Sequence, residues 1–503
     1  MRHLPDRAAF AATYRDGRPQ VVWTSLVSDL DTPVSAMIKL ADGQPNSFLF
    51  ESVTGGEIRG RYSFIGLKPD LIWRCRRGEA EINRSARLDP HAFEPCPEAA
   101  LQSLRSLISE SRIDLPPELP PMAAGLFGYL GYDMVRLIER IPDTRPDTLG
   151  VPDGILIRPT IVAVFDGITS LITLVTPVWP RDGVDADAAY GHAVERLADA
   201  VADLGRSAPR QSIAAQADAA PLPAPVSNTA RADYLAMVER AKEYIRAGDA
   251  FQIVPSQRFS VPFRLPPFSL YRALRRLNPS PFLFFLDLGD LSLVGSSPEI
   301  LVRLRDGRVT VRPIAGTRPR GRDAEEDRAL AADLLADPKE LAEHLMLLDL
   351  GRNDVGRVSR VGTVRVTEQM AVELYSHVMH IVSNVEGEIA PGLDALDALF
   401  AGFPAGTVSG APKVRAMEII DELERARRGV YAGCVGYFGA SGAMDTCIAL
   451  RTAVLKDGMM HVQAGGGVVA DSDPEAEYQE TVNKATALIR AAEEAVRFAQ
   501  APA

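Results

Sequence analysis

Two pairs of glutamates stand three residues apart in segments with helical character. Glu340 and Glu343 lie in ELAEHLMLLDLGRND, and Glu477 and Glu480 lie in DPEAEYQETVNKA. Because positions three apart share one helix face, each pair places like charges side by side. A divalent cation such as Mg²⁺, which prefers carboxylate oxygens, would relieve the repulsion, and so would a basic partner or a solvated surface. A metal site and a solvated helix face are therefore the alternatives.

Three glycine-containing segments could bring backbone N–H groups to an anionic ligand. They are PIAGTRPRG after a strand-like run, PAGTVSGAPKVRAMEII at the start of an expected helix, and QAGGGVV. A helix N-terminus favours anions, and glycine lets the backbone approach a ligand closely. Ordinary turns and bulges would explain each segment taken alone. The candidate contacts are Gly316, Thr317, Thr407, Gly465, Gly466 and Gly467.

Two titratable side chains lie in apolar surroundings. His380 is part of SHVMHIVSNVEG, and Arg451 is part of IALRTAV. A histidine in such a run can be a core residue or a catalyst. A guanidinium there needs an anionic partner, which a structural carboxylate or a substrate would supply.

The chain as a whole has the composition of a globular protein. It has 503 residues, of which 46% are hydrophobic and 24% charged, and its net charge of −11 disfavours nucleic acid and anionic membranes as partners. Four cysteines show neither a disulfide framework nor zinc-site spacing. The start lacks a signal-peptide core, and no uncharged apolar run reaches the roughly 18 residues of a membrane span. A cytoplasmic protein is expected.

Hairpins dominate the expected strands. Apolar runs turn at Asp166-Gly167, Asp306-Gly307 and Asp457-Gly458, which predicts antiparallel pairing rather than the alternating units of a Rossmann sheet. Helices are expected at 231–247, 323–350, 411–427 and 474–498, the last opening at Pro474. Strands and helices mixed in this way predict an α+β fold.

One change in composition divides the chain. Residues 205–230 are rich in Ala, Pro, Ser and Gln and contain few large apolar residues, which predicts a linker or mobile loop. It separates an N-terminal region, 1–204, from a C-terminal region, 231–503. Both have the usual size of a domain.

Several motifs, met in order, resemble those of one family. They are PSQRF, NPSPF, GSSPE, PIAGTRPRG, SHVMHIVS and the two acidic segments above. The chain resembles component I, the large subunit, of anthranilate synthases within the chorismate-utilising enzyme family. The resemblance covers residues 232–490, and FLFESVTGGEIRGRYSFIG extends it into the N-terminal region. It implies a two-lobed antiparallel β-sheet sandwich flanked by helices.

The resemblance also implies a reaction. Chorismate is aminated at C2 with loss of its 4-hydroxyl, and pyruvate is then eliminated to give anthranilate, the first committed step of tryptophan biosynthesis. Glu299, in GSSPE, matches the acid that protonates the departing hydroxyl, and neighbouring carboxylates would raise its pKa. His380 matches the histidine of the pyruvate-elimination half. The implied catalytic residues are Glu299, His380 and Thr407.

Ligands carry over in the same way. The resemblance implies Mg²⁺ bound by Glu343 and Glu480, with Glu340 and Glu477 beside it. Arg451 would neutralise a substrate carboxylate, for which a bidentate guanidinium is well suited. The implied chorismate contacts are Gly316, Thr317, Tyr431, Arg451, Gly465, Gly466, Gly467 and Lys484.

Two positions separate the related reactions. Isochorismate and salicylate synthases carry a lysine base where this chain has Gln252, and aminodeoxychorismate synthases carry a nucleophilic lysine where it has Ala315. Both differences favour free ammonia as the nucleophile. An aminodeoxyisochorismate synthase, an aminodeoxychorismate synthase and a non-catalytic ligand-sensing module are the alternatives.

The source of the ammonia is expected on another chain. YAGCVGY around Cys434 has Ala432 where a glutaminase nucleophile turn needs glycine, and no H-x-E pattern follows it. Cys434 therefore reads as a small apolar strand residue. A separate glutamine amidotransferase subunit is the expected partner, in a heterotetramer.

Two short segments resemble the tryptophan feedback site of the family. FLFESV and NPSPFLFF join the two regions of the chain, and interdomain packing is the alternative. A carboxylate or hydroxyl can bind the ligand's ammonium group, and proline and aromatic faces can pack an indole. The implied inhibitor contacts are Glu51, Ser52, Pro281, Phe282 and Leu283.

Overall fold

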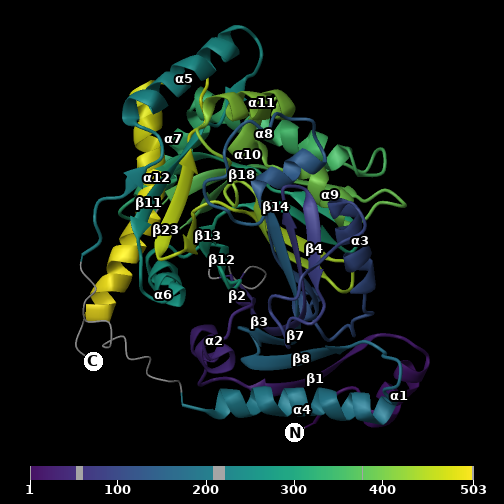
Figure 1. The fold of residues 1–503 in the computed structure, drawn as a ribbon. Coiled ribbons are helices and arrows are strands. Elements are labelled where there is room, and N and C mark those ends of the chain that lie inside the picture. Colours follow the sequence, from purple (N-terminus) through teal and green to yellow (C-terminus); the bar gives the residue numbers. More distant parts are fainter. Residues whose placement is uncertain (1, 53–59, 208–220, 376–377, 501–503) are drawn as a thin grey trace.

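A large antiparallel sheet organises the computed structural model, which describes residues 2–52, 60–207, 221–375 and 378–500 (Figure 1). Hydrogen bonds join 21 strands, and β10 and β19 form a separate pair. Every strand pairing in the described part of the chain is antiparallel, and helices flank the sheet. The predicted α+β class is confirmed.

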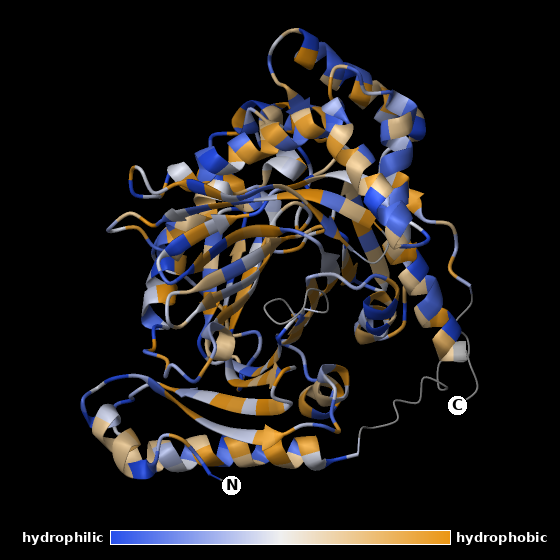
Figure 2. Ribbon diagram, turned by 180° about the vertical axis from the view of Figure 1, so that it is seen from behind, coloured by the Kyte–Doolittle hydropathy of each residue, from blue (hydrophilic) through white to orange (hydrophobic). Residues whose placement is uncertain are grey.

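The N-terminal region supplies eight strands and four α-helices. They are α1 (Arg7–Arg15), β1 (Gln20–Val27), α2 (Pro33–Ala41), β2 (Ser47–Glu51), β3 (Tyr62–Arg76), β4 (Glu79–Asn83), β5 (Glu94–Pro95), α3 (Ala100–Glu110), β6 (Gly125–Leu130), β7 (Gly154–Asp166), β8 (Leu171–Val178) and α4 (Ala186–Gly205), with 3-10 turns η1 (Pro121–Ala123) and η2 (Tyr132–Leu137). Helix α4 lies along β1 and β8 (Figure 2). Its buried residues recur every three or four positions and are mostly alanines, so the helix can pack closely.

The remaining elements form the C-terminal region. They are β9 (Val226–Ser227), α5 (Arg231–Arg246), β10 (Gln252–Ile253), β11 (Ser256–Pro262), α6 (Pro267–Leu277), β12 (Phe282–Asp287), β13 (Ser292–Ser297), β14 (Ile300–Arg305), β15 (Arg308–Val311), β16 (Ile314–Pro319), α7 (Ala324–Ala336), α8 (Pro338–Gly356), β17 (Arg365–Leu374), β18 (Val378–Glu388), α9 (Ala395–Gly402), α10 (Gly406–Ser409), β19 (Gly410–Ala411), α11 (Lys413–Leu423), β20 (Cys434–Gly439), β21 (Met444–Ile448), β22 (Thr452–Lys456), β23 (Met459–Gly465) and α12 (Pro474–Gln500).

The three predicted hairpins are present. Strand β7 returns as β8, β14 as β15, and β22 as β23. In the last two, the Asp and the Gly of the turn both have positive φ, as a type I′ turn requires: 49° and 71° at Asp306-Gly307, 50° and 72° at Asp457-Gly458. Local chemistry therefore sets these registers.

One helix prediction is wrong. Residues 323–350 were expected to form a single helix, but they form α7 and the first part of α8. Asp337 caps α8 by accepting the N–H of Lys339 at 3.0 Å, and Pro338 takes the first helical position. Proline there cannot donate the hydrogen bond that a continuous helix would need. The expected helices at 231–247, 411–427 and 474–498 are present as α5, α11 and α12.

Strands of the two regions pair with each other. Strand β2 lies beside β12, and β6 lies beside β20. The division into 1–204, 205–230 and 231–503 stays a prediction, and residues 208–220 of the expected linker lie outside the described residues. No helix in the described residues combines the length and the apolar composition that a bilayer crossing requires.

Candidate active site

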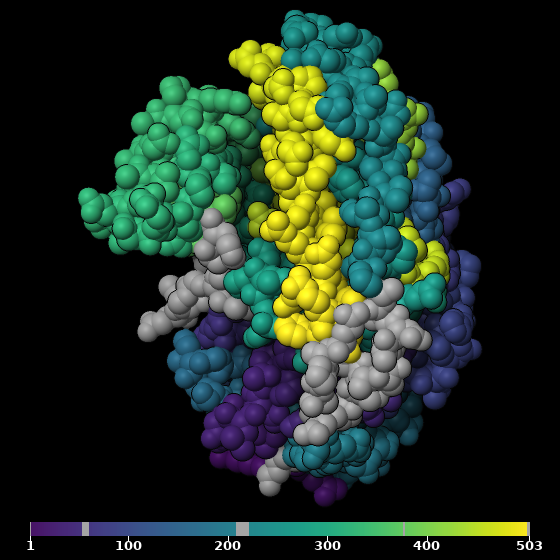
Figure 3. All heavy atoms as spheres, turned by 90° about the vertical axis from the view of Figure 1, so that its left-hand side faces the viewer, coloured from purple at the N-terminus to yellow at the C-terminus, as the bar shows by residue number. Residues whose placement is uncertain are grey.

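The two acidic helices come together. Glu340 and Glu343 lie on α8, and Glu477 and Glu480 lie on α12. Figure 3 shows the surface hollowed between α12 and the part of the chain that holds α7 and α8. Burial raises the pKa of Glu343, and the charges of Glu340 and Glu480 raise it further. The carboxylates of both helices therefore act on one another, as a shared cation site requires.

Glu477 adds an unsatisfied oxygen to this acidic group. Ser472 Oγ donates to Glu477 Oε1 at 2.7 Å, while Oε2 is buried without a hydrogen bond. Burial raises the pKa of Glu477, and Glu480 raises it again. An orphaned buried carboxylate oxygen fits a site that a hard cation completes.

The carboxylates are near one another but do not converge on one point. No set of three or more His, Cys, Asp or Glu side chains within the described ranges is close enough to hold a metal ion. Two of the carboxylates have other partners: Lys484 Nζ lies 2.6 Å from Glu480 Oε1, and Gln252 Nε2 donates to Glu343 Oε1 at 3.3 Å. The donor set suits Mg²⁺, and the metal site stays a prediction.

The glycine turn after β23 lies against the same helix. A Cβ on Gly466 would stand 2.7 Å from Glu477 Oε2, and one on Gly465 would stand 2.8 Å from the Tyr431 hydroxyl. Position 465 requires glycine, because a Cβ there would also stand 2.8 Å from the main-chain oxygen of Pro255. Lys484 Nζ also donates to the carbonyl oxygen of Gly465 at 2.9 Å. The structure therefore brings Tyr431, Lys484 and this turn together, with Gly467 facing Gln252.

Glu299 is buried between β13 and β14. Thr407 Oγ1, on the short helix α10, lies 3.3 Å from Oε2, and the N–H of Ile314 also points at the carboxyl. Burial raises the pKa of Glu299 to about 8, and both hydrogen bonds oppose that rise. Neighbouring carboxylates were the expected cause, and that explanation is wrong. Glu299 is protonated at neutral pH and can act as an acid.

A pH dependence follows from this carboxyl. Glu299 must hold a proton to donate it, and it loses that proton as the pH rises through about 8. We expect kcat/KM for chorismate, which reports the free enzyme, to fall roughly tenfold per pH unit above that value. The rate should be measured at a fixed concentration of unprotonated ammonia. A rate that stays level up to pH 10 would contradict this assignment.

His380 lies on β18 opposite Thr317 of β16. Its Nδ1 lies 3.0 Å from the carbonyl oxygen of Gly316 and 3.1 Å from Thr317 Oγ1. A carbonyl only accepts, so Nδ1 carries the proton and Nε2 is the basic nitrogen. Burial lowers the pKa of His380, and the charge of Arg451 lowers it further. A neutral imidazole of this kind can take a proton.

Arg451 lies in the turn between β21 and β22, with φ of 47°. Burial lowers its pKa, and within the described part of the chain its guanidinium makes no ion pair. Its positive charge lowers the pKa of His380. A desolvated guanidinium beside the candidate base can bind a carboxylate of the substrate.

The expected inhibitor residues line one cavity. Its volume is about 540 Å³, and Glu51, Ser52, Pro281, Phe282 and Leu283 all contribute to its wall. Pairing of β2 with β12 sets Glu51 opposite Leu283. Glu51 is buried and accepts hydrogen bonds from Tyr271 and Arg275, so its charge is already balanced.

Other residues of this cavity escaped the sequence reasoning. Val435, Tyr437, Asp445 and Cys447 come from β20 and β21, and Tyr375 packs its ring against His380, with centroids 5.3 Å apart. Val435 and Tyr437 lie in YAGCVGY, which was considered only as a glutaminase turn, and Tyr375 directly precedes SHVMHIVS. Only the pairing of distant strands places them here.

Comparison with known proteins bears directly on these sites. Residues 48–490 match the family model described as chorismate binding enzyme. Anthranilate synthase component 1 of Cereibacter sphaeroides is 63% identical over 492 residues, which cover 98% of both chains. The chain belongs to the anthranilate synthase component 1 family of chorismate-binding enzymes. The family resemblance drawn from the motifs is confirmed.

Two solved structures share the fold of this family member. Anthranilate synthase component I from Streptococcus pneumoniae has a TM-score of 0.75 at 39% identity and covers 92% of this chain and 98% of that one. The menaquinone-specific isochorismate synthase of Escherichia coli has a TM-score of 0.70 at 19% identity over 97% of this chain and 100% of that one, a likeness of fold alone. In sequence, anthranilate synthase component 1 of Pseudomonas putida is 51% identical over 92% of this chain and 93% of that one.

Proposed function

We propose that the chain converts chorismate and ammonia to anthranilate and pyruvate, the first step of tryptophan biosynthesis. The observation that carries this proposal is the buried Glu299, protonated at neutral pH beside Thr407. It supplies an acid for the leaving hydroxyl. The lysines of the related reactions are replaced by Gln252 and by Ala315 in β16, which leaves ammonia as the nucleophile.

The side chains divide the work between the two halves of the reaction. Glu299 gives its proton to the 4-hydroxyl as ammonia adds at C2, so the hydroxyl leaves as water. His380 then takes a proton at Nε2 as the bond to pyruvate breaks and the ring becomes aromatic. Arg451 holds a carboxylate of chorismate, which fixes the ring between the acid and the base.

The family's Mg²⁺ fits the acidic residues of α8 and α12. Glu343 and Glu480 would hold the ion, and Glu340 and Glu477 would bind its waters. Bound there, Mg²⁺ supplies positive charge for a carboxylate of the substrate. The glycines of the turn after β23 and Lys484 border the same place.

The decisive experiment uses the purified chain with chorismate, Mg²⁺ and ammonium at alkaline pH. We expect anthranilate fluorescence and an equal amount of pyruvate. An aminated product without pyruvate would identify an aminodeoxyisochorismate synthase instead. If no aminated product formed, the proposal would be wrong.

The name component 1 in the relatives implies a second component, and we infer that it is a glutamine amidotransferase. We expect glutamine to replace ammonium only after that subunit is added, since YAGCVGY lacks the glutaminase turn. Efficient turnover of glutamine by the single chain would refute this. Cytoplasmic location and the heterotetramer belong to the same proposal.

We propose that L-tryptophan binds in the 540 Å³ cavity and inhibits the enzyme. Ser52→Arg should abolish that inhibition, because a guanidinium side chain fills space meant for the ligand. Overpacking costs about 1–3 kcal/mol, which corresponds to about 5- to 150-fold in affinity. Inhibition curves and calorimetry measure the effect.

The matched control for this variant is Ser25→Arg on the exposed side of β1. It should leave inhibition and catalysis unchanged. Ser52→Arg should also spare ammonia-dependent turnover. If tryptophan gave no calorimetric signal with the wild-type chain, the cavity would have another role.

A further inference from the structure

Glu424 and Arg428 form a buried ion pair just beyond α11. Arg428 Nη2 lies 2.6 Å from Glu424 Oε1, and the two side chains are only 1% and 5% exposed, the arginine being the lower. The Arg428 Nε also donates to both carboxylate oxygens at 3.1 Å. Apolar residues of equal volume often stabilise a core as well as such a pair does, so stability is a weak reason for its presence.

Arg428 hydrogen-bonds to the main chain of two segments of the candidate active site. Its Nη1 donates to the carbonyl oxygen of Val408 at 2.7 Å, and its Nη2 donates to that of Val254 at 2.6 Å. Val408 follows Thr407, the partner of Glu299, and Val254 stands two residues after Gln252, the partner of Glu343.

Glu424 hydrogen-bonds to a third segment. Its Oε1 accepts the N–H of Ser256 at 2.8 Å and the hydroxyl of Ser256 at 2.7 Å. Ser256 Oγ in turn accepts from Gln463 Nε2 at 2.8 Å, two residues before the glycine turn that borders Glu477. The ring of Tyr431 also lies 5.4 Å from the Arg428 guanidinium carbon.

We propose that Glu424 and Arg428 are positioning residues, which hold Thr407 within reach of Glu299 and Gln252 within reach of Glu343. Neither side chain touches those groups: Arg428 acts through main-chain carbonyl oxygens, and Glu424 acts through Arg428 and through the N–H and hydroxyl of Ser256. The inference deepens the proposed function and rests on it, since it concerns the same acid. It assigns the buried charges a catalytic purpose that the stability of the fold does not demand.

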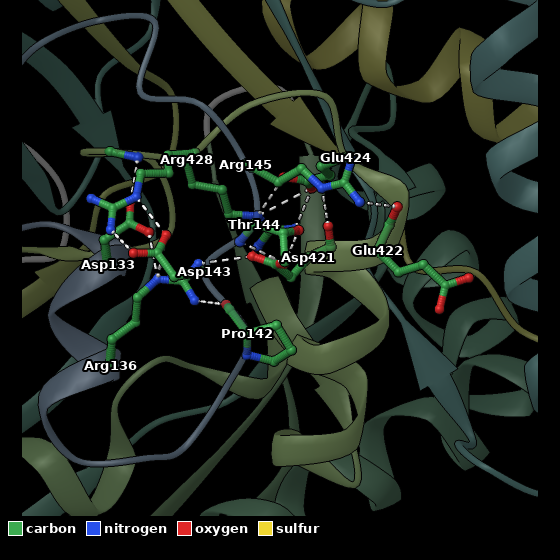
Figure 4. A network of polar contacts seen from close by, with 12 residues as sticks. Asp133, Arg136, Pro142, Asp143, Thr144, Arg145, Asp421, Glu422, Glu424 and Arg428 are labelled. Carbon is green, nitrogen blue, oxygen red and sulfur yellow. Dashed lines mark hydrogen bonds and ion pairs between the residues drawn. The ribbon is translucent and has the colours of Figure 1, made fainter.

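Figure 4 shows other polar contacts that hold the end of α11 near Glu424 and Arg428. Arg136 and Thr144 bind the Asp421 carboxylate at the C-terminal end of α11, and Arg145 binds main-chain oxygens there. These contacts hold the helix end to η2 and to the segment after it, and none of them involves a residue of the candidate active site. Arg136→Lys is therefore a matched control.

The pH profile provides a specific readout. The hydrogen bond from Thr407 lowers the pKa of Glu299 against the effect of burial. The small cavity that Glu299 lines also contains Asp354, whose charge is paired with Lys413 at 3.0 Å. Movement of Thr407 should therefore raise the pKa of Glu299, and removal of its hydroxyl in Thr407→Val should do the same.

We expect Arg428→Lys and Glu424→Gln to lower kcat by about 10- to 100-fold, the cost of a small misplacement, with little change in KM. The alkaline limb of the kcat/KM profile should shift to higher pH and coincide with the limb measured for Thr407→Val. An infrared titration of the buried carboxyl should show the same shift without using activity. Arg136→Lys should leave the alkaline limb and the infrared titration at their wild-type values.

Two results would overturn the proposal. One is a loss of activity that only follows the loss of folded protein, while the alkaline limb of kcat/KM and the titration of the Glu299 carboxyl stay at their wild-type pH. The other is wild-type kcat in both variants. If Arg428→Lys does not fold, Glu424→Gln and Ser256→Ala decide by the same measurements. A chain that makes no anthranilate would refute the proposed function, while the infrared titration would still report the place of Thr407.

Discussion

Glu299→Gln should lower kcat by about 10²- to 10⁴-fold, the usual contribution of a general acid. Glutamine keeps the shape and can still accept the hydrogen bond that Thr407 Oγ1 makes at 3.3 Å. It has no proton to give to the departing hydroxyl. The expected loss is therefore in the chemical step, while KM for chorismate stays close to the wild-type value.

A partly buried carboxyl away from the site provides the control. Burial also raises the pKa of Asp287, at the end of β12, so Asp287→Asn tests whether the loss of any such group harms turnover. We expect near-normal kcat for Asp287→Asn and a normal far-ultraviolet spectrum for both variants. A Glu299→Gln enzyme that kept a tenth of its activity would point to another acid.

Glu343→Gln and Glu480→Gln should each raise the Mg²⁺ concentration needed for half-maximal activity by at least about 10- to 100-fold. Removal of a group that only hydrogen-bonds to a metal ligand typically lowers metal affinity by that factor, and removal of a ligand should lower it at least as much. An amide oxygen carries no charge, and a hard cation prefers carboxylate. Activity against Mg²⁺ concentration measures the effect, and calorimetric titration of Mg²⁺ gives it independently of turnover.

The control for this pair lies on α12, the helix that carries Glu480. Glu475 on α12 is exposed and paired with Arg231, away from Glu343. Glu475→Gln should leave the Mg²⁺ dependence unchanged. If Glu343→Gln and Glu480→Gln both behaved like Glu475→Gln, the acidic faces of α8 and α12 would be solvated surfaces, the alternative that the spacing alone left open.

The sequence by itself determined the features that depend on neighbours in the chain. Asp-Gly at 306–307 and 457–458 specifies its turn because both residues adopt positive φ. Pro474 opens α12 because the first helical position needs no N–H donor. The motifs likewise identified the family, since each is short and continuous. The break at Pro338 was readable from the same rule and was missed.

Only the tertiary structure decided how those parts act on each other. Burial, set by strands that pair across more than a hundred residues, raises the pKa of Glu299, where neighbouring carboxylates were expected to do so. Gln252 binds Glu343, which lies 91 residues away in the chain, and Arg428 binds carbonyl oxygens of two remote segments. Charge, desolvation and hydrogen bonding act through space, so residue order does not reveal them.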